Sequence, residues 1–449
     1  MLIVHIAITS ANYNNSEESN TNNTNNVSSQ PGIPSLRKKR KTNDLLRGES
    51  LKEFLSEYSQ AELGLKNDGK YSPWGKYNTM LKHALHTEKR FSFVRKKIQS
   101  WSFDPLKYGK DELRPYAKAM YDNIDAASDE FTVNMEKCTN FIQVVLNGYR
   151  DVAYHNAYHA LSVAHNCHMY VTDTIAKEYL VPIERVALLT AGFGHDIDHP
   201  GTNNGFQISS STPLAMLYND VSVLENHHAA TTCKIFSKLD CQFIETENKS
   251  ILKYFRSTII KSILATDMIH HADKVKKVRD IARRVTKARE NHKDVDPFDV
   301  SNENSRMFLC AIIIHSADLS NPVIYDFEVV YKWASMVCEE FEAQTTMEKE
   351  AGLPVTAYLV GVTDNIKKAK LQISFYDYII TPWYEAVAGC LPKARLIYAN
   401  VEVNRRHWVD IARGQDPQEK LQQIKNAKAS SHLKRRGRVR TQSLLGGNF

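Results

Sequence analysis

The segment "ERVALLTAGFGH", residues 184–195, decides the fold prediction, because its apolar side chains recur at spacings of three and four residues. This spacing is typical of a helix with a buried face. Most of the chain from residue 75 to 415 repeats it, with Pro, Gly and polar turns between the apolar runs and few alternating, strand-like stretches. Further examples are "NFIQVVLNGY" (140–149), "SILATDMIHHADKVKKVRDIARRV" (262–285) and "MFLCAIIIHSADL" (307–319). We therefore predict an all-α fold.

The composition, with 42% hydrophobic residues, is typical of a globular protein. No run approaches the roughly 18 to 20 apolar residues that span a bilayer, and "MLIVHIAIT" at the N-terminus lacks the positive n-region of a secretory signal. The seven cysteines form no C-x-x-C motif and no dense framework, so we expect reduced thiols in a cytoplasmic protein.

The positive charge belongs to the ends of the chain. The net charge is +7, but "RKKRK" (37–41) and "KRRGRVR" (434–440) together carry ten positive charges. Without them, 48 basic residues face 51 acidic ones, a net charge of −3. This balance argues against a nucleic-acid-binding body. The basic runs could direct the protein to the nucleus or to an anionic membrane surface, although a solvated linker is the simpler interpretation.

These patterns divide the chain into four parts. Residues 1–44, with eight asparagines between positions 12 and 26, are predicted to be disordered. Residues 45–74 form a helical lead-in, which could pack as a first helix, dock on a partner or mediate a homodimer. Residues 75–415 form the helical body, and residues 416–449 form a basic, flexible tail with unknown partners.

Histidines and aspartates gather at three points of the body. His155 and His159 lie four residues apart, which on a helix places them on one face. His195 and Asp196 follow an apolar helix directly, and Asp318 ends another one, where an unpaired buried carboxylate would be costly. Two neutral histidines and two carboxylates suit a divalent ion with open positions for water, as in a hydrolytic site.

Six segments, taken together and in order, resemble the signatures of the class I 3',5'-cyclic nucleotide phosphodiesterase catalytic domain. They are "YHNAYHA" (154–160), "GHDIDHPGTNN" (194–204), "LENHHAA" (224–230), "LATDM" (264–268), "HSADLSNP" (315–322) and "LQISFYDYIITPW" (371–383). The resemblance implies a compact, multi-helix catalytic domain of the HD-type metal-dependent phosphohydrolases, here over residues 75–415.

The resemblance also implies a two-metal site. His159, His195, Asp196 and Asp318 match the ligands of a first ion, usually zinc, and Asp196 matches a bridge to a second ion, usually magnesium or manganese. His155 matches the general acid that protonates the departing O3′ of the ribose. Proton donation of this kind accelerates a reaction by about 10²- to 10⁴-fold.

Two further residues match supporting roles. Glu225 matches an acidic residue that orients the acid histidine, and His199 matches a residue near the metal-bound water.

Six residues match the substrate pocket of the family. Gln372 matches the glutamine that pairs with the purine edge, Phe375 matches the aromatic residue that stacks on the base, and Val337 matches the opposite side of that clamp. Tyr154 and Met268 match other pocket positions. Asn321 matches a position where members that prefer cAMP often carry asparagine, so we expect a preference for cAMP. A freely rotating Gln372 amide would instead accept both cAMP and cGMP, because an amide both donates and accepts.

The sequence departs from the family pattern at two places. Ser162 stands where many relatives have an aspartate, and "EEFEAQTTMEKE" (339–350) replaces a segment that usually contains Q-G-D. The second departure leaves open the conformation of the loop near 345–365, which borders the substrate pocket in the family. Three other functions stay open: a phosphodiesterase that prefers cGMP, a related phosphohydrolase acting on other nucleotides, and a catalytically silent nucleotide-binding scaffold, although no metal ligand or acid histidine is missing.

Overall fold

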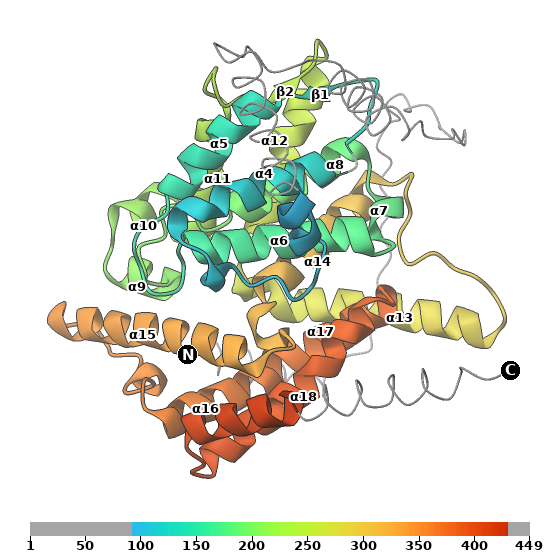
Figure 1. Ribbon diagram of the computed structural model, residues 1–449. Coiled ribbons are helices and arrows are strands. Elements are labelled where there is room, and N and C mark those ends of the chain that lie inside the picture. The colour runs from blue at the N-terminus through green and yellow to red at the C-terminus, as the bar shows by residue number, and fades with distance from the viewer. Residues whose placement is uncertain (1–91, 125, 430–449) are drawn as a thin grey trace, which may run out of the picture. The chain divides into compact units, whose positions relative to one another are not determined.

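The computed structural model describes residues 92–124 and 126–429, and all of them belong to one compact unit. The predictions for residues 1–44 and 45–74, including the homodimer segment, lie outside these residues. In the described part the chain is almost wholly helical (Figure 1), which confirms the all-α prediction. Its two strands, β1 (Thr132–Val133) and β2 (Ile244–Glu245), form a two-residue antiparallel pair.

A first group of helices precedes residue 265. It begins with a helical turn at 92–98, which is followed by η2 (Pro105–Lys107), η3 (Lys110–Glu112), α4 (Leu113–Asn123), α5 (Met135–Asn147), α6 (Ala157–Asp173), α7 (Ala176–Tyr179), α8 (Pro182–Gly194), α9 (Asn204–Ser209), α10 (Pro213–Leu217), α11 (Val223–Phe236) and α12 (Lys249–Leu264).

The remaining helices form the second half. They are η4 (Met268–His270), α13 (His271–Glu290), α14 (Glu303–Asp318), η5 (Asn321–Val323), α15 (Phe327–Glu350), η6 (Ala357–Leu359), α16 (Asn365–Phe375), the π-helical turn η7 (Tyr376–Ile380), α17 (Thr381–Cys390) and α18 (Ala394–Ala412). In Figure 1, α14 lies with the first group, whereas α13 and α15 to α18 form a second group below it.

Helix α8 is the central helix of the first group. All its residues from Ile183 to Gly194 are buried, and it packs against α6, α11, α12 and α14 (Figure 1). A helix that is apolar on every side has to be enclosed by others. Its start is fixed by Pro182 in the first turn and by Glu184, whose Oε2 accepts a hydrogen bond of 3.0 Å from the Val181 amide.

A glycine sets the distance between α8 and α11. A Cβ atom on Gly194 would lie 2.1 Å from Oγ1 of Thr232, and that hydroxyl donates a 3.1 Å hydrogen bond to the Gly194 carbonyl. Only glycine permits this approach. Because His195 directly follows Gly194, this contact also fixes the position of His195, a candidate metal ligand.

Residues 417–429 correct the predicted boundary of the C-terminal tail. They are helical, Leu421 belongs to the hydrophobic core, and Lys428 pairs with Asp326 at 3.0 Å. The prediction of a flexible tail from residue 416 is therefore wrong for this stretch, because its apolar positions are buried against the body. The basic run at 434–440 lies outside the described residues.

Two sequence-based expectations concern the chain as a whole. All seven cysteines are unpaired and buried, which confirms the expectation of free thiols. Among the described residues, none of the helices combines the length and the apolar character required to cross a bilayer.

Candidate active site

Four side chains converge where α6, α8 and α14 meet. His159 lies in the first turn of α6, His195 follows α8, and Asp318 is the last residue of α14. The Nε2 atoms of His159 and His195 are 3.2 Å apart, and Oδ1 of Asp318 lies 3.1 Å from the first and 3.4 Å from the second. Oδ2 of Asp196 lies 3.0 Å from Nε2 of His195 and 3.4 Å from Nε2 of His159. The structure thus brings together the four predicted metal ligands.

The donor set fits a divalent ion. Ligand atoms about 2.1 Å from an ion lie roughly 3.0 to 3.4 Å from one another, which is the range of these contacts. Nδ1 of His195 donates to the Gly192 carbonyl at 3.0 Å, so in the neutral ring the lone pair of Nε2 points into the cluster. Both histidines are completely buried. Without an ion, nitrogen and carboxylate lone pairs would face one another inside the protein.

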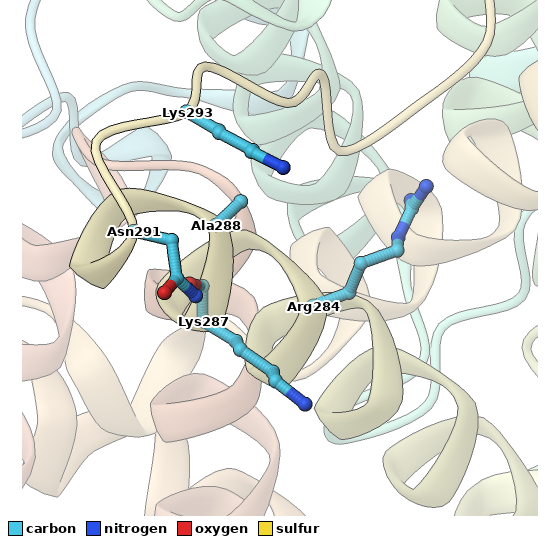
Figure 2. A pocket seen from close by; sticks show the side chains of 5 residues that line it. All are labelled: Arg284, Lys287, Ala288, Asn291 and Lys293. Atoms are coloured by element: carbon cyan, nitrogen blue, oxygen red, sulfur yellow. The ribbon is translucent and has the colours of Figure 1, made fainter.

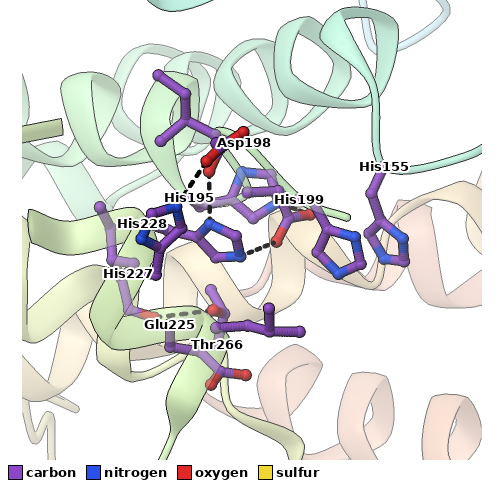
Figure 3. Close-up of polar contacts among 12 residues, drawn as sticks. His155, His195, Asp198, His199, Glu225, His227, His228 and Thr266 are labelled. Carbon is purple, nitrogen blue, oxygen red and sulfur yellow. Dashed lines mark hydrogen bonds and ion pairs between the residues drawn. The ribbon is translucent and has the colours of Figure 1, made fainter. Parts of the chain in front are cut away.

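His155 lies beside this cluster but not on a helix. Asn156 caps α6 by accepting a 3.0 Å hydrogen bond from the Tyr158 amide, so the helix begins after His155. The idea that His155 and His159 share one helix face is therefore wrong, although their rings are only 5.7 Å apart. The ring of His155 stacks on that of His199, with centroids 3.9 Å apart (Figure 3).

The carboxylate that orients His155 comes from α15. Glu340 is hydrogen-bonded to Nδ1 of His155, and its Oε2 accepts from the backbone amides of Tyr154 at 2.8 Å and of His155 at 3.1 Å. Burial lowers the pKa of His155, but the charge and hydrogen bond of Glu340 outweigh it and raise that pKa to about 9. Burial opposes the charge of Glu340 as well, and His155 nevertheless holds the pKa of this carboxyl at about 2. The contact with Glu340 therefore favours the charged form of His155.

The prediction that Glu225 orients His155 is wrong. Oε2 of Glu225 accepts a 2.9 Å hydrogen bond from Asn204. In Figure 3 its side chain lies near Thr266, away from His155. Burial, and secondarily the charge of Asp267, raise the pKa of Glu225 to about 7. The error arises because the contact between His155 and Glu340 joins residues 185 positions apart, which a local motif does not reveal.

His199 and His228 line the side of Asp196 that faces away from the four-ligand cluster. Nδ1 of His199 accepts a 3.0 Å hydrogen bond from the Gly201 amide, so its Nε2 carries the proton. Nδ1 of His228 donates to the Ile197 carbonyl at 2.7 Å, and its Nε2 lies 3.7 Å from Oδ1 of Asp196. The three residues together form a second group of converging ligand atoms.

Comparison with known proteins agrees with this arrangement. Residues 154–401 match the family described as "3'5'-cyclic nucleotide phosphodiesterase". The chain belongs to this family. It is 32% identical over 314 residues to "3',5'-cyclic-nucleotide phosphodiesterase regA" of Dictyostelium discoideum, and this match covers 69% of this chain and 38% of that protein. It is 29% identical over 359 residues to the human "High affinity cGMP-specific 3',5'-cyclic phosphodiesterase 9A", covering 80% of this chain and 57% of the relative.

Solved structures agree on the fold. The phosphodiesterase domain of the RhoPDE fusion protein from Salpingoeca rosetta superposes with a TM-score of 0.65 at 29% identity, covering 70% of this chain and 96% of that domain. The all-helical fold of phosphodiesterase catalytic domains is therefore confirmed. The chain spans only 38% and 57% of the length of the two curated relatives above.

The residues predicted for the purine pocket of a phosphodiesterase are only partly linked to one another. Nδ2 of Asn321 donates a 2.9 Å hydrogen bond to the hydroxyl of Tyr154, and its Oδ1 accepts from Ser162 at 3.3 Å. Val337 lies on α15, and Gln372 and Phe375 share one face of α16, which packs against α15. Met268 begins η4.

Gln372 differs from Asn321 in its contacts. Its side chain is buried, but among the described residues it forms no hydrogen bond through its amide.

Sequence reasoning missed Glu340, although a signal exists. Positions 340, 344 and 348 carry Glu, Gln and Glu at a spacing of four residues within a helix that also contains apolar residues such as Trp333 and Cys338. Three polar residues in line on the buried face of a helix require partners. The pattern would have directed attention to Glu340 rather than to Glu225.

A surface hollow lies elsewhere, at the end of α13 (Figure 2). It is lined by Arg284, Lys287, Ala288, Asn291 and Lys293. Cations are favoured at the C-terminal end of a helix by its dipole, and Arg284 also donates to the Pro297 carbonyl at 2.8 Å. The charge of this hollow therefore has a structural explanation, and none of its residues belongs to the histidine and aspartate cluster.

Proposed function

We propose that this chain is a metal-dependent 3',5'-cyclic nucleotide phosphodiesterase that prefers cAMP and releases 5'-AMP. The observation that carries the proposal is the position of His155, a histidine held by a buried carboxylate, beside four converging metal-ligand atoms. A hydrolysis that expels an alkoxide needs these two components, one to supply the nucleophile and one to protonate the leaving group.

His159, His195, Asp196 and Asp318 would hold the first ion, for which zinc suits the two imidazoles. The two oxygens of Asp196 face different sides, Oδ2 toward His195 and Oδ1 toward His228. Asp196 could thus bridge to a second ion, magnesium or manganese, near His199. Bound together, the ions would activate a water molecule as the nucleophile.

His155 would donate its Nε2 proton to the O3′ atom of the ribose, because its Nδ1 is directed at Glu340. The buried Glu340 stabilises the charged ring until the proton leaves, and it orients the ring through the two adjacent backbone amides. His199 stacks on this ring and presents an Nε2 proton. That proton could orient the attacking water.

The preference for cAMP rests on Asn321. Among the described residues its Oδ1 has one partner, Ser162, whose hydroxyl donates a long hydrogen bond, so it can accept a second one from the adenine amino group. Gln372, Phe375, Val337, Met268 and Tyr154 would complete the pocket. A second candidate, an enzyme that accepts both nucleotides, is favoured by the absence of a hydrogen-bond partner for the Gln372 amide in the described part of the chain.

The test is steady-state hydrolysis of cAMP and cGMP by the purified chain with magnesium, manganese or a chelator, alongside His155→Ala and Asp318→Ala. We expect metal-dependent turnover of cAMP at lower concentration than cGMP, and its loss in both variants. Asp280→Ala is a matched control, because this aspartate is exposed and, within the described part of the chain, pairs with Arg283 on the same helix alone. Equal use of both nucleotides would support the second candidate. No turnover by folded, metal-loaded protein would refute the proposal.

A further inference from the structure

Helix α15 carries a row of three buried polar side chains: Glu340, Gln344 and Glu348. Each is 4% exposed or less. Residues four apart lie on one helix face and roughly 6 Å apart along the axis. The row therefore extends about 12 Å from the general acid along α15.

The row binds three separate loops. Glu340 holds the backbone at Tyr154 and His155. Oε1 of Gln344 accepts a 2.9 Å hydrogen bond from the amide of Asn203, in the loop that follows His199. Glu348 accepts two hydrogen bonds from Thr356, one of 2.7 Å from its amide and one of 2.8 Å from its hydroxyl.

The donor and acceptor roles of Gln344 and Glu348 are fixed by their neighbours. The Asn203 amide can only donate, so the oxygen of the Gln344 amide must face it, and Nε2 of Gln344 must face Glu348, to which it donates at 2.8 Å. The Thr356 amide also can only donate. Residue 348 therefore receives donors on both sides and has to be an ionised carboxylate, which accepts without donating.

The loop held by Glu348 consists of residues 351–364, the segment whose conformation the sequence left open. It is also fixed at its far end, where Leu359 and Val362 are buried and Glu342 accepts from the amide and the hydroxyl of Thr363. Loss of the Glu348 contacts would thus displace the first half of the segment rather than release it entirely.

We propose that Gln344 and Glu348 are positioning residues, which fix the 351–364 segment relative to the loop after His199 and thereby set the affinity for the nucleotide. This role rests on the proposed function, in which the segment joins α15 to α16, the helices that carry Val337, Gln372 and Phe375 of the proposed pocket. Neither side chain contacts the reacting atoms. Their effect is on substrate binding and not on the chemical step.

The direction of the hydrogen bonds supplies a specific test. In Glu348→Gln, whichever way the new amide turns, one of its N–H groups faces another donor. In Gln344→Glu, two carboxylates face each other. The double variant Gln344→Glu with Glu348→Gln restores the pattern. Its carboxylate at position 344 accepts from Asn203 and from the new amide at position 348, whose oxygen accepts from Thr356. The double variant also keeps the wild-type charge.

Two measurements read the outcome. Hydrogen exchange of peptides covering residues 351–364, followed by mass spectrometry, reports whether the segment is held. Steady-state kinetics with cAMP and with bis(p-nitrophenyl) phosphate, which lacks purine and ribose, separates nucleotide binding from the chemical step. Glu350→Gln, at an exposed position of the same helix, is the matched control for loss of a carboxylate.

We expect each single variant to exchange faster at 351–364 and to raise KM for cAMP about tenfold, the equivalent of about 1.4 kcal/mol. We expect kcat and the activity on bis(p-nitrophenyl) phosphate to change little, and the double variant to recover both exchange and KM. Unchanged exchange, an unchanged KM, or no recovery in the double variant would each overturn the proposal. If the wild type hydrolyses no cyclic nucleotide, the proposed function fails, and exchange in the four proteins alone decides whether the row holds the segment.

Discussion

The two sides of the candidate site differ in how firmly their side chains are held. On the metal and acid side, His195 is fixed by the Gly192 carbonyl and His155 by Glu340. On the purine side, the amide of Gln372 forms no hydrogen bond among the described residues, and Asn321 lies between two hydroxyl groups. A hydroxyl both donates and accepts, so neither neighbour dictates which way the Asn321 amide is turned.

On the proposed assignment, the groups for the chemical step are ordered before substrate binds, whereas the groups proposed to distinguish purines would adjust to the ligand. Preorganised charges stabilise a transition state without reorganising during the reaction. A side-chain amide that can rotate provides less discrimination between substrates, because discrimination requires unmatched groups to be left unpaired.

Asp318→Asn should have the largest effect, because it removes one of two carboxylates from the ligand set. Oδ1 of Asp318 contacts both histidines of the cluster. We expect the chain to lose bound metal and kcat to fall by more than the roughly 10²-fold that follows loss of an outer-shell metal partner. Elemental analysis by mass spectrometry, together with kinetics, checks both. Retention of metal and activity would show that Asp318 is not a ligand.

His155→Ala should come next. Removal of a general acid costs about 10²- to 10⁴-fold in kcat. Unlike Asp318→Asn, this variant should keep its metal, because His155 is outside the four-ligand set. The two variants together therefore separate metal binding from proton donation. Loss of metal in His155→Ala would contradict the division between the two roles.

Glu340→Gln should have a smaller effect that depends on pH. In the wild type the pKa of His155 is raised to about 9, so the acid is lost only as the pH rises through that value. Without the carboxylate, the charge and the hydrogen bond that raise the pKa of His155 are both lost, so this pKa falls. The alkaline limb of kcat/KM should therefore move to lower pH in Glu340→Gln. Coincident limbs in both proteins would contradict this account.

The contact between His155 and Glu340 also contributes to the free energy of unfolding, and this contribution depends on pH. The raised pKa of His155 means that its contribution is complete below its ordinary value of 6.5 and disappears as the pH rises through 9. The lowered pKa of Glu340 means that its contribution is present above 4.5 and disappears as the pH falls through 2. In Glu340→Gln both contributions are lost. The melting temperatures of the two proteins should therefore differ most between pH 4.5 and 6.5.

The sequence sufficed to identify four residues that converge as candidate metal ligands, because each of them lies at or near a helix end that apolar periodicity marks. His195 follows α8, and Asp318 ends α14. The helices are long and buried, so their packing brings these ends together. The same reasoning overextends α6, since it places His155 on the helix without considering that Asn156 is a favoured N-cap.

Two other features could not be read locally. The spacing of Glu340, Gln344 and Glu348 marks position 340 on the buried face of α15, but its partner, His155, depends on how α15 packs. The helix at 417–429 carries many charges, so its pattern favours a tail. Its ion pairs with α15, α18 and Asp326 depend on the tertiary structure.

The smallest effects should come from variants on the purine side. They test whether the side chains there are held less firmly than those on the metal and acid side. If the Gln372 amide rotates to suit either base, Gln372→Ala should lower kcat/KM for cAMP and cGMP by a similar factor, about tenfold for one lost hydrogen bond. Asn321→Ala should instead change the ratio between the two nucleotides, because adenine presents an amino group at C6 from which the Asn321 oxygen accepts a hydrogen bond, whereas guanine presents an oxygen there. The ratio of kcat/KM values, measured in a mixture of both substrates, tests this directly. If Gln372→Ala changes the ratio and Asn321→Ala leaves it intact, then Gln372 is held in one orientation when substrate binds, and the purine side is as firmly ordered as the metal side.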